Sequence, residues 1–99
     1  MTHEIMVGLT VTDDELYRQY RAAMAPLLRA HGGGFRYDFT VAKVLESVSD
    51  HAINRVFAIY FESRARKEAF FAHPEYLAIK QRFFLRSVSG TTIFGEYER

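Results

Sequence analysis

The chain has 99 residues, a formal net charge of +1, no cysteine, and hydrophobic residues at 48% of its positions. The length fits one domain spanning 1–99. The near-neutral charge excludes the dense basic surface typical of nucleic-acid binding, and the lack of cysteine excludes disulfides and thiolate chemistry. No apolar run approaches the roughly 18–20 residues of a membrane span, and the first residues do not resemble a secretory signal. We therefore expect a cytoplasmic protein that binds neither nucleic acid nor membrane.

The first part of the chain predicts a strand followed by an amphipathic helix. Every second residue over 4–11 is a branched apolar one, which is typical of a strand. Thr12 and Glu15 have the spacing of a capping box, so we expect the helix to start there. A 3.6-residue apolar period continues to about residue 30. Pro26 lies inside this stretch and, because it lacks a backbone donor, is a candidate kink.

Residues 31–34 read His-Gly-Gly-Gly, a string that also occurs in the oxyanion hole of lipase-type hydrolases. That role needs a nucleophile elbow and a much larger fold, and this chain has neither. Glycine directly after a helix supplies the left-handed conformation that closes it. We therefore predict that Gly32 ends the helix and that the string joins the helix to the next strand.

Two further strands are predicted over 35–46 and 53–61. In the first, alternation places Arg36, Asp38 and Thr40 on one face, and the pattern blurs near 42–45, where a bulge would fit. The second is apolar on both faces, so both faces should be covered. Between these strands, 47–52 form a polar turn.

The last part of the chain predicts a broken helix and a final strand. Ser63 suits the N-cap of a helix that runs to about residue 72. Pro74 suits the first turn of a second helical segment, which continues toward Arg86, and His73 would then lead into it. Gly90 precedes the last strand.

The resulting order β-α-β-β-α-β predicts a ferredoxin-like α+β fold, in which a four-stranded antiparallel sheet carries both helices on one face. Nothing in the chain covers the opposite face. It would hold a larger apolar patch than a monomer usually exposes, made of Met6, Val56, Ala58, Tyr60 and Phe94. We therefore expect a homodimer in which two sheets meet face to face.

Several short pieces occur in an order and spacing that resemble a known family: Tyr17-x-x-Tyr20, Gly32-Gly33, Leu45-Glu46 and Pro74-Glu75-Tyr76. The chain resembles the dimeric α+β barrel superfamily and, within it, domain-of-unknown-function family 1330, whose members are small bacterial proteins. It departs from the usual pattern at 38–40, where members tend to have Arg-Gly-Gly. The resemblance implies the fold and the dimer. The wider relatives include cofactor-free monooxygenases, a lactone isomerase, haem-degrading enzymes and ligand-sensing domains, so the fold selects no function.

Four polar residues are the candidates for a site. Tyr60 is expected on the sheet face turned toward the partner, where it would orient a substrate or simply pack at the interface. Asp38 and Arg36 would supply polar or proton-carrying groups if their strand face points into the barrel, and would otherwise face solvent. His51 would lie at the mouth of a pocket or be solvated in its turn. Tyr60 and Asp38 are the catalytic candidates.

Two other groups of residues are expected to be structural. The four histidines show neither HxH nor HExxH spacing, so no metal site is predicted, and no cofactor motif occurs. Arg55 should face the helices and form an ion pair, with Glu46 as a candidate partner.

These observations leave two functional hypotheses. In the first, the dimer binds a small aromatic or apolar metabolite in a cavity between the two sheets, and acts on it without a cofactor as the resemblance to monooxygenases and an isomerase implies. In the second, the chain is a non-catalytic ligand-binding or dimerisation module. A cavity of about 300 Å³ or more with convergent polar groups favours the first hypothesis. A sheet face filled by partner side chains favours the second.

Overall fold

The computed structural model describes residues 1–99, and its elements follow the predicted order. They are β1 (His3–Val11), α1 (Asp14–Ala30), β2 (Gly34–Thr40), β3 (Arg55–Phe61), α2 (Arg64–Ala72), α3 (Pro74–Ile79), η1 (Lys80–Phe84), α4 (Leu85–Ser87) and β4 (Val88–Glu98). None of the helices combines the length and apolar character that a bilayer crossing requires.

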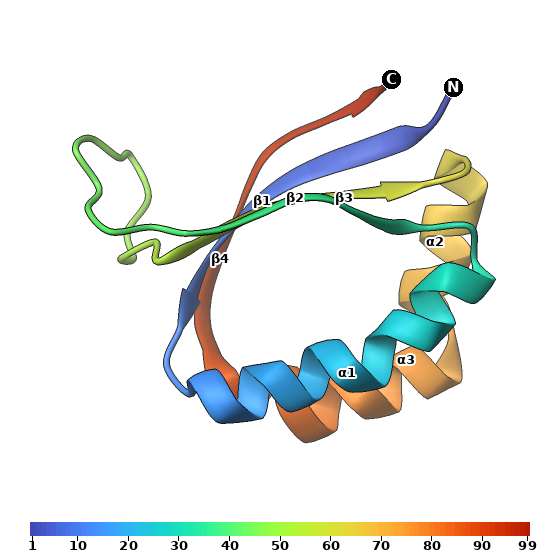
Figure 1. The fold of residues 1–99 in the computed structure, drawn as a ribbon, viewed down its shortest axis with the longest axis horizontal. Coiled ribbons are helices and arrows are strands. Elements are labelled where there is room, and N and C mark those ends of the chain that lie inside the picture. Colours follow the sequence, from blue (N-terminus) through green and yellow to red (C-terminus); the bar gives the residue numbers. More distant parts are fainter.

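The four strands form one antiparallel sheet in the order β2-β3-β1-β4. The helices lie together on one side of this curved sheet (Figure 1). We call that side the helix face and the opposite side the open face, on which Met6, Ala58 and Tyr60 lie. This arrangement confirms the predicted ferredoxin-like α+β fold.

The hydrophobic core lies between the helix face of the sheet and the helices. Alternate residues of β1 and β3 face it, and α1 adds one residue from each of its successive turns. Its 13 buried members are Ile5, Val7, Leu9, Val11, Tyr17, Tyr20, Met24, Leu28, Phe57, Ile59, Phe61, Phe70 and Tyr76. The heavy aromatic content of the sequence is therefore used in part to fill this layer.

The two ends of α1 are fixed by local hydrogen bonds. The predicted cap at Thr12 is wrong by one residue, because the Asp13 carboxylate accepts the Leu16 backbone N–H at 3.0 Å. Thr12 instead donates its hydroxyl to the Ser87 carbonyl at 3.3 Å, which ties the start of α1 to the end of α4. Gly32 has a φ of 70°, so the predicted left-handed closure is confirmed.

A one-residue bulge in β2 changes which side chains share a face. Phe35 pairs with Ile59, but the next pair is Tyr37 with Ala58, so Arg36 is the extra residue. Beyond the bulge, the side chains change sides relative to a regular strand. The prediction that Arg36 and Asp38 share one face is therefore wrong: Asp38, opposite Phe57, faces the helices.

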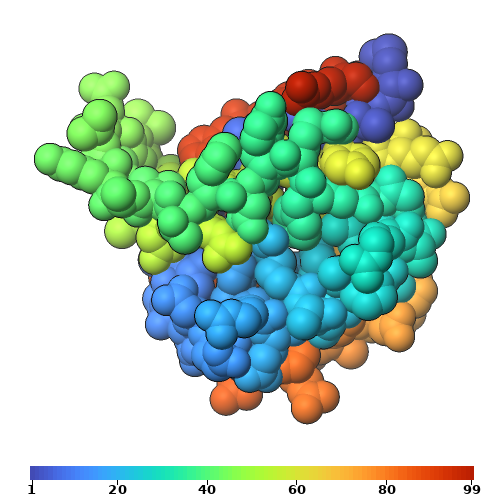
Figure 2. Space-filling model, viewed as in Figure 1, coloured from blue at the N-terminus to red at the C-terminus, as the bar shows by residue number.

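The strand predicted over 35–46 is shorter than expected, because β2 ends at Thr40. Residues 41–54 instead form an irregular segment, whose first part projects from the rest of the molecule (Figures 1 and 2) and whose last part returns to the sheet, where Ile53 is buried. Leu45 and Val48 are almost fully exposed in the projecting part. The β2–β3 pairing ends with a hydrogen bond from the Val41 backbone N–H to the Asn54 carbonyl at 2.9 Å.

The broken second helix follows the prediction up to Ile79. The Ser63 hydroxyl caps α2 by accepting the Arg66 N–H at 3.2 Å, and the His73 ring accepts the Glu75 N–H at 3.1 Å at the start of α3. The helix then widens into a π-turn, η1, in which the N–H of Leu85 bonds to the carbonyl of Lys80 five residues back. The last strand begins at Val88, earlier than Gly90 indicated.

Candidate functional site

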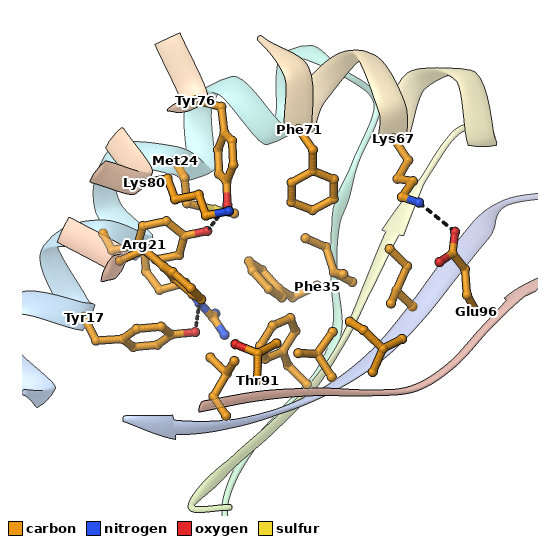
Figure 3. Close-up of a pocket in the computed structure, with 18 residues that line it drawn as sticks. Tyr17, Arg21, Met24, Phe35, Lys67, Phe71, Tyr76, Lys80, Thr91 and Glu96 are labelled. Carbon is orange, nitrogen blue, oxygen red and sulfur yellow. Dashed lines mark hydrogen bonds and ion pairs between the residues drawn. The ribbon is translucent and has the colours of Figure 1, made fainter. Parts of the chain in front are cut away.

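A cavity of about 460 Å³ lies inside the chain, between the helices and the helix face of the sheet (Figure 3). Thirteen of its 18 lining residues are hydrophobic, and they come from β1, β2, β3, β4 and every helical element except α4. Polar groups reach it from α1, α2, α3, η1 and β4. They are Tyr17, Tyr20, Arg21, Lys67, Tyr76, Lys80, Thr91 and Glu96.

Two tyrosine hydroxyls meet in the wall of the cavity. Tyr20 on α1 and Tyr76 on α3 are both buried, and their hydroxyl oxygens lie 2.8 Å apart. Burial raises the pKa of both phenols. Both therefore stay protonated at neutral pH, and one hydroxyl donates to the other.

Arg21 on α1 is held in place from several sides. Its Nε donates to the Tyr17 hydroxyl at 2.8 Å, and its guanidinium lies 3.8 Å from the centre of the Phe35 ring. Its terminal nitrogens contact the Asp38 carboxylate at 3.1 and 3.3 Å. The guanidinium is thus fixed by an anion, a phenol and an aromatic face, an arrangement that suits its flat shape.

Asp38 is shared between two arginines. In addition to Arg21, it accepts two hydrogen bonds from Arg55, at 2.8 and 2.9 Å. Partial burial would raise the pKa of Asp38, but the hydrogen bonds and charges of both arginines outweigh this effect and lower it. The predicted ion pair of Arg55 on the helix face therefore exists, with Asp38 in place of Glu46.

In another part of the cavity lining, Lys67 and Glu96 form an ion pair, with 2.8 Å between the ammonium nitrogen and a carboxylate oxygen (Figure 3). Glu96 also contacts the Nε2 of buried His3 at 2.6 Å, and Glu98 contacts the Nδ1 of the same ring at 2.9 Å. Burial would lower the pKa of His3, but the two carboxylates outweigh it and raise the pKa. The carboxylate of Glu96 is therefore already occupied by Lys67 and His3.

Lys80 is the third cation in the lining, and it differs from Arg21 and Lys67. No carboxylate lies within 4.0 Å of its ammonium group, whereas the other two cations have acidic partners. It begins the π-turn, and Tyr76, Lys80 and Phe84 all line the cavity. In a regular α-helix each step of four residues turns the side chain by about 40°. The wider π-turn reduces this drift and keeps all three side chains on the cavity.

Comparison with family models places residues 5–88 in DUF1330, described as a domain of unknown function. The chain belongs to this family. The resemblance noted in the sequence is thereby confirmed, and it covers most of the chain. No curated protein matches the sequence.

Solved structures support the fold of this DUF1330 chain at low sequence identity. A protein of unknown function from Rhodopseudomonas palustris matches with a TM-score of 0.83 and 14% identity, over 99% of this chain and 82% of that one. A candidate antibiotic biosynthesis monooxygenase from Nitrosomonas europaea matches at 0.60 and 13%, over 99% and 89%. A dimeric ferredoxin-like protein of unknown function from Bacteroides fragilis matches at 0.57 and 14%, over 99% and 96%.

None of the four candidate residues lines the cavity of the DUF1330 chain, although Asp38 reaches it through Arg21. Arg36 and Tyr60 lie together on the open face, with the guanidinium 4.4 Å from the ring centre. Arg36 also contacts the buried Glu4 carboxylate at 2.5 Å. A ligand contact by Arg36 or Tyr60 stays a prediction.

His51 fastens its loop to the sheet of the DUF1330 chain. Its Nδ1 and Nε2 lie 2.7 Å from the hydroxyls of Thr10 and Thr92, on β1 and β4. Both ring nitrogens are therefore engaged within the chain, and His51 does not line the cavity. A ligand contact by His51 also stays a prediction.

The polar residues of the cavity were not identified as site residues from the sequence. Tyr17 and Tyr20 fit the apolar stripe of the first predicted helix, and Lys67 follows a basic run typical of a solvated helix face, so neither pattern indicates a site. The signal that could have found them is the spacing of Tyr76, Lys80 and Phe84, which places a lysine between two aromatic residues along one helix side. The cavity also lies on the face of the sheet opposite to the predicted one, and the predicted cavity between two sheets stays a prediction.

Proposed function

We propose that this DUF1330 chain binds a small, mainly apolar organic molecule in the cavity between its helices and its sheet. The observation that carries this proposal is the cavity itself, with a volume of about 460 Å³ and a mostly hydrophobic lining. This volume falls in the range of about 300–1,000 Å³ that is usual for small-molecule sites. The phenols and cations in the wall would orient the polar end of such a ligand.

Binding without proton abstraction is the activity that the lining supports best. A general base needs a free carboxylate, histidine or similar group close to the reacting atom. The lining contains no histidine, and its one carboxylate, Glu96, is occupied by Lys67 and His3. Cofactor-independent catalysis is the second candidate, and it is favoured by the likeness in fold to the candidate antibiotic biosynthesis monooxygenase from N. europaea.

The proposal includes a cytoplasmic homodimer joined through the open face. Several large apolar side chains are exposed on that face, among them Tyr37, Phe39 and Phe94, with 48%, 54% and 52% of their surface accessible. The dimeric protein from B. fragilis, which has the same fold, supports a homodimer. Pairing there would leave the helix-side cavity of each chain available to a ligand.

The binding proposal can be tested with phenylnaphthylamine, a neutral probe whose fluorescence rises in apolar surroundings. The wild-type chain should bind it saturably. Thr91 lines the cavity, so Thr91→Trp should fill part of the space and weaken binding by at least about tenfold.

The matched control is Leu77→Trp, because Leu77 is about half exposed on α3 and lies outside the lining. This variant should bind the probe as the wild type does. Equal binding by the two tryptophan variants, or no binding by the wild type, would contradict a ligand site in this cavity.

A further inference from the structure

The cavity presents hydroxyl protons that no group in the chain accepts. Tyr20 and Tyr76 make a single hydrogen bond with each other, which uses one of their two protons and leaves the other without an acceptor. The Tyr17 hydroxyl accepts from Arg21, and its own proton meets no acceptor. All three phenols are at most 5% exposed, so bulk water does not readily take these protons.

The charges of the lining, like the free hydroxyl protons, favour a ligand that carries negative charge. Three cations and one carboxylate line the cavity. The carboxylate is paired, and Lys80 is the cation that has no acidic partner. Tyr76 and Lys80 are four residues apart, so they are neighbours on the same helix side. Figure 3 shows both side chains directed into the cavity from that side.

Free donors and an uncompensated cation, in a lining whose one carboxylate is already paired, are complementary to an anionic oxygen group. The rest of the wall is apolar and aromatic, with Phe35, Phe57, Phe71 and Phe84 among its members. We propose that the ligand is an aromatic organic acid, whose anionic group contacts Lys80 and the Tyr20–Tyr76 pair while its ring lies among the phenylalanines. This inference rests on the proposed function and names its class of ligand.

The experiment compares two probes that differ in one group. Anilinonaphthalene sulfonate carries an anionic sulfonate, and phenylnaphthylamine has the same aromatic frame without it. Fluorescence titration of the wild type should give at least about tenfold tighter binding of the anionic probe. Added salt should weaken binding of the anionic probe and leave the neutral one unchanged. For each probe, only the part of the fluorescence that is absent from the Thr91→Trp variant is attributed to the cavity.

Variants then locate the anionic contact. Lys80→Met keeps the apolar stem of the side chain. It should weaken binding of the anionic probe about tenfold and change binding of the neutral probe less than about twofold. The control is Arg86→Met, which removes the same charge from an exposed site outside the lining and should change neither. The double variant Tyr20→Phe/Tyr76→Phe should weaken binding of the anionic probe about fivefold. If this variant does not fold, Lys80→Met still decides the question.

The outcomes separate the two proposals. If the neutral probe binds as tightly as the anionic one, or if Lys80→Met and Arg86→Met behave alike, the anionic ligand class is wrong and the apolar site remains. If neither probe binds in the cavity, the proposed function is wrong and this inference fails with it.

Discussion

At the scale of single residues, Asp38 organises the polar edge of the cavity. It bonds Arg21 and Arg55 together, and Arg21 in turn contacts Tyr17 and Phe35. Without the carboxylate, two guanidinium groups would face each other with no anion between them. The shape of this part of the wall therefore depends on a residue that does not line the cavity itself.

Asp38→Asn should destabilise the fold at neutral pH by about 1–2 kcal/mol, a modest value because Asp38 is about one-third exposed. The folded-state pKa of Asp38 lies below its ordinary value of 3.8. The stabilising contribution is therefore present above that value and is lost as the pH falls through the lower, folded-state pKa. Urea unfolding of the wild type and of Asp38→Asn should show that the difference in their free energies of unfolding shrinks as the pH falls through this range. A difference that is constant with pH would contradict the ion-pair account.

At the scale of elements, close packing at the α1–β2 joint explains why glycines follow His31. A Cβ added to Gly33 would lie 2.7 Å from the backbone carbonyl oxygen of Tyr60 and 2.6 Å from Leu28. The helix end and the edge of the sheet thus approach more closely than any side chain allows. This close approach sets the distance between the C-terminal end of α1 and the sheet.

Gly33→Ala should therefore cost about 2 kcal/mol or more in free energy of unfolding, because the carbonyl it meets cannot move without breaking the β2–β3 pairing. Gly95→Ala is the matched control, since its added Cβ would have no neighbour closer than 3.8 Å. It should change stability by less than about 0.5 kcal/mol. Equal effects of the two changes in thermal or urea unfolding would contradict the packing argument.

The element order and the two sheet faces of β1 and β3 could be predicted because hydrophobic periodicity repeats over many residues and averages out local exceptions. The polar site could not be predicted in the same way. The bulge at Arg36 is a single extra residue, yet it moves Asp38 to the other face. The π-turn at Lys80 likewise changes one helical repeat and leaves no composition signal. Both irregularities control side chains at the cavity, and both depend on tertiary packing.

At the scale of the whole molecule, the two faces of the sheet have different roles. The helix face forms one wall of the cavity, and the open face exposes aromatic side chains, including the stacked pair Tyr37 and Phe39, whose ring centres lie 5.9 Å apart. A dimer through the open face would bury these rings and leave both cavities intact. The proposed dimer therefore serves stability and does not itself form the ligand site.

Static light scattering at micromolar concentration should give about twice the 11.5 kDa of one chain. Phe39→Glu places a charge in the proposed interface and should weaken the dimer by at least about tenfold. Leu77→Glu introduces the same charge on the helix side, at a site of similar exposure, and should leave the mass unchanged. A wild-type monomer, or equal masses for both variants, would contradict pairing through the open face.

The central claim is that the ligand site lies between the helices and the sheet of each chain. A crystal structure of the complex with anilinonaphthalene sulfonate tests it most directly. The account predicts the aromatic rings among Phe35, Phe57 and Phe84, with the sulfonate in hydrogen-bond contact with Tyr76 or Lys80. The open face offers the competing place, a groove of about 810 Å³ between 41–49 and the sheet. The probe bound in that groove, with the helix-side cavity empty of it, would contradict the account.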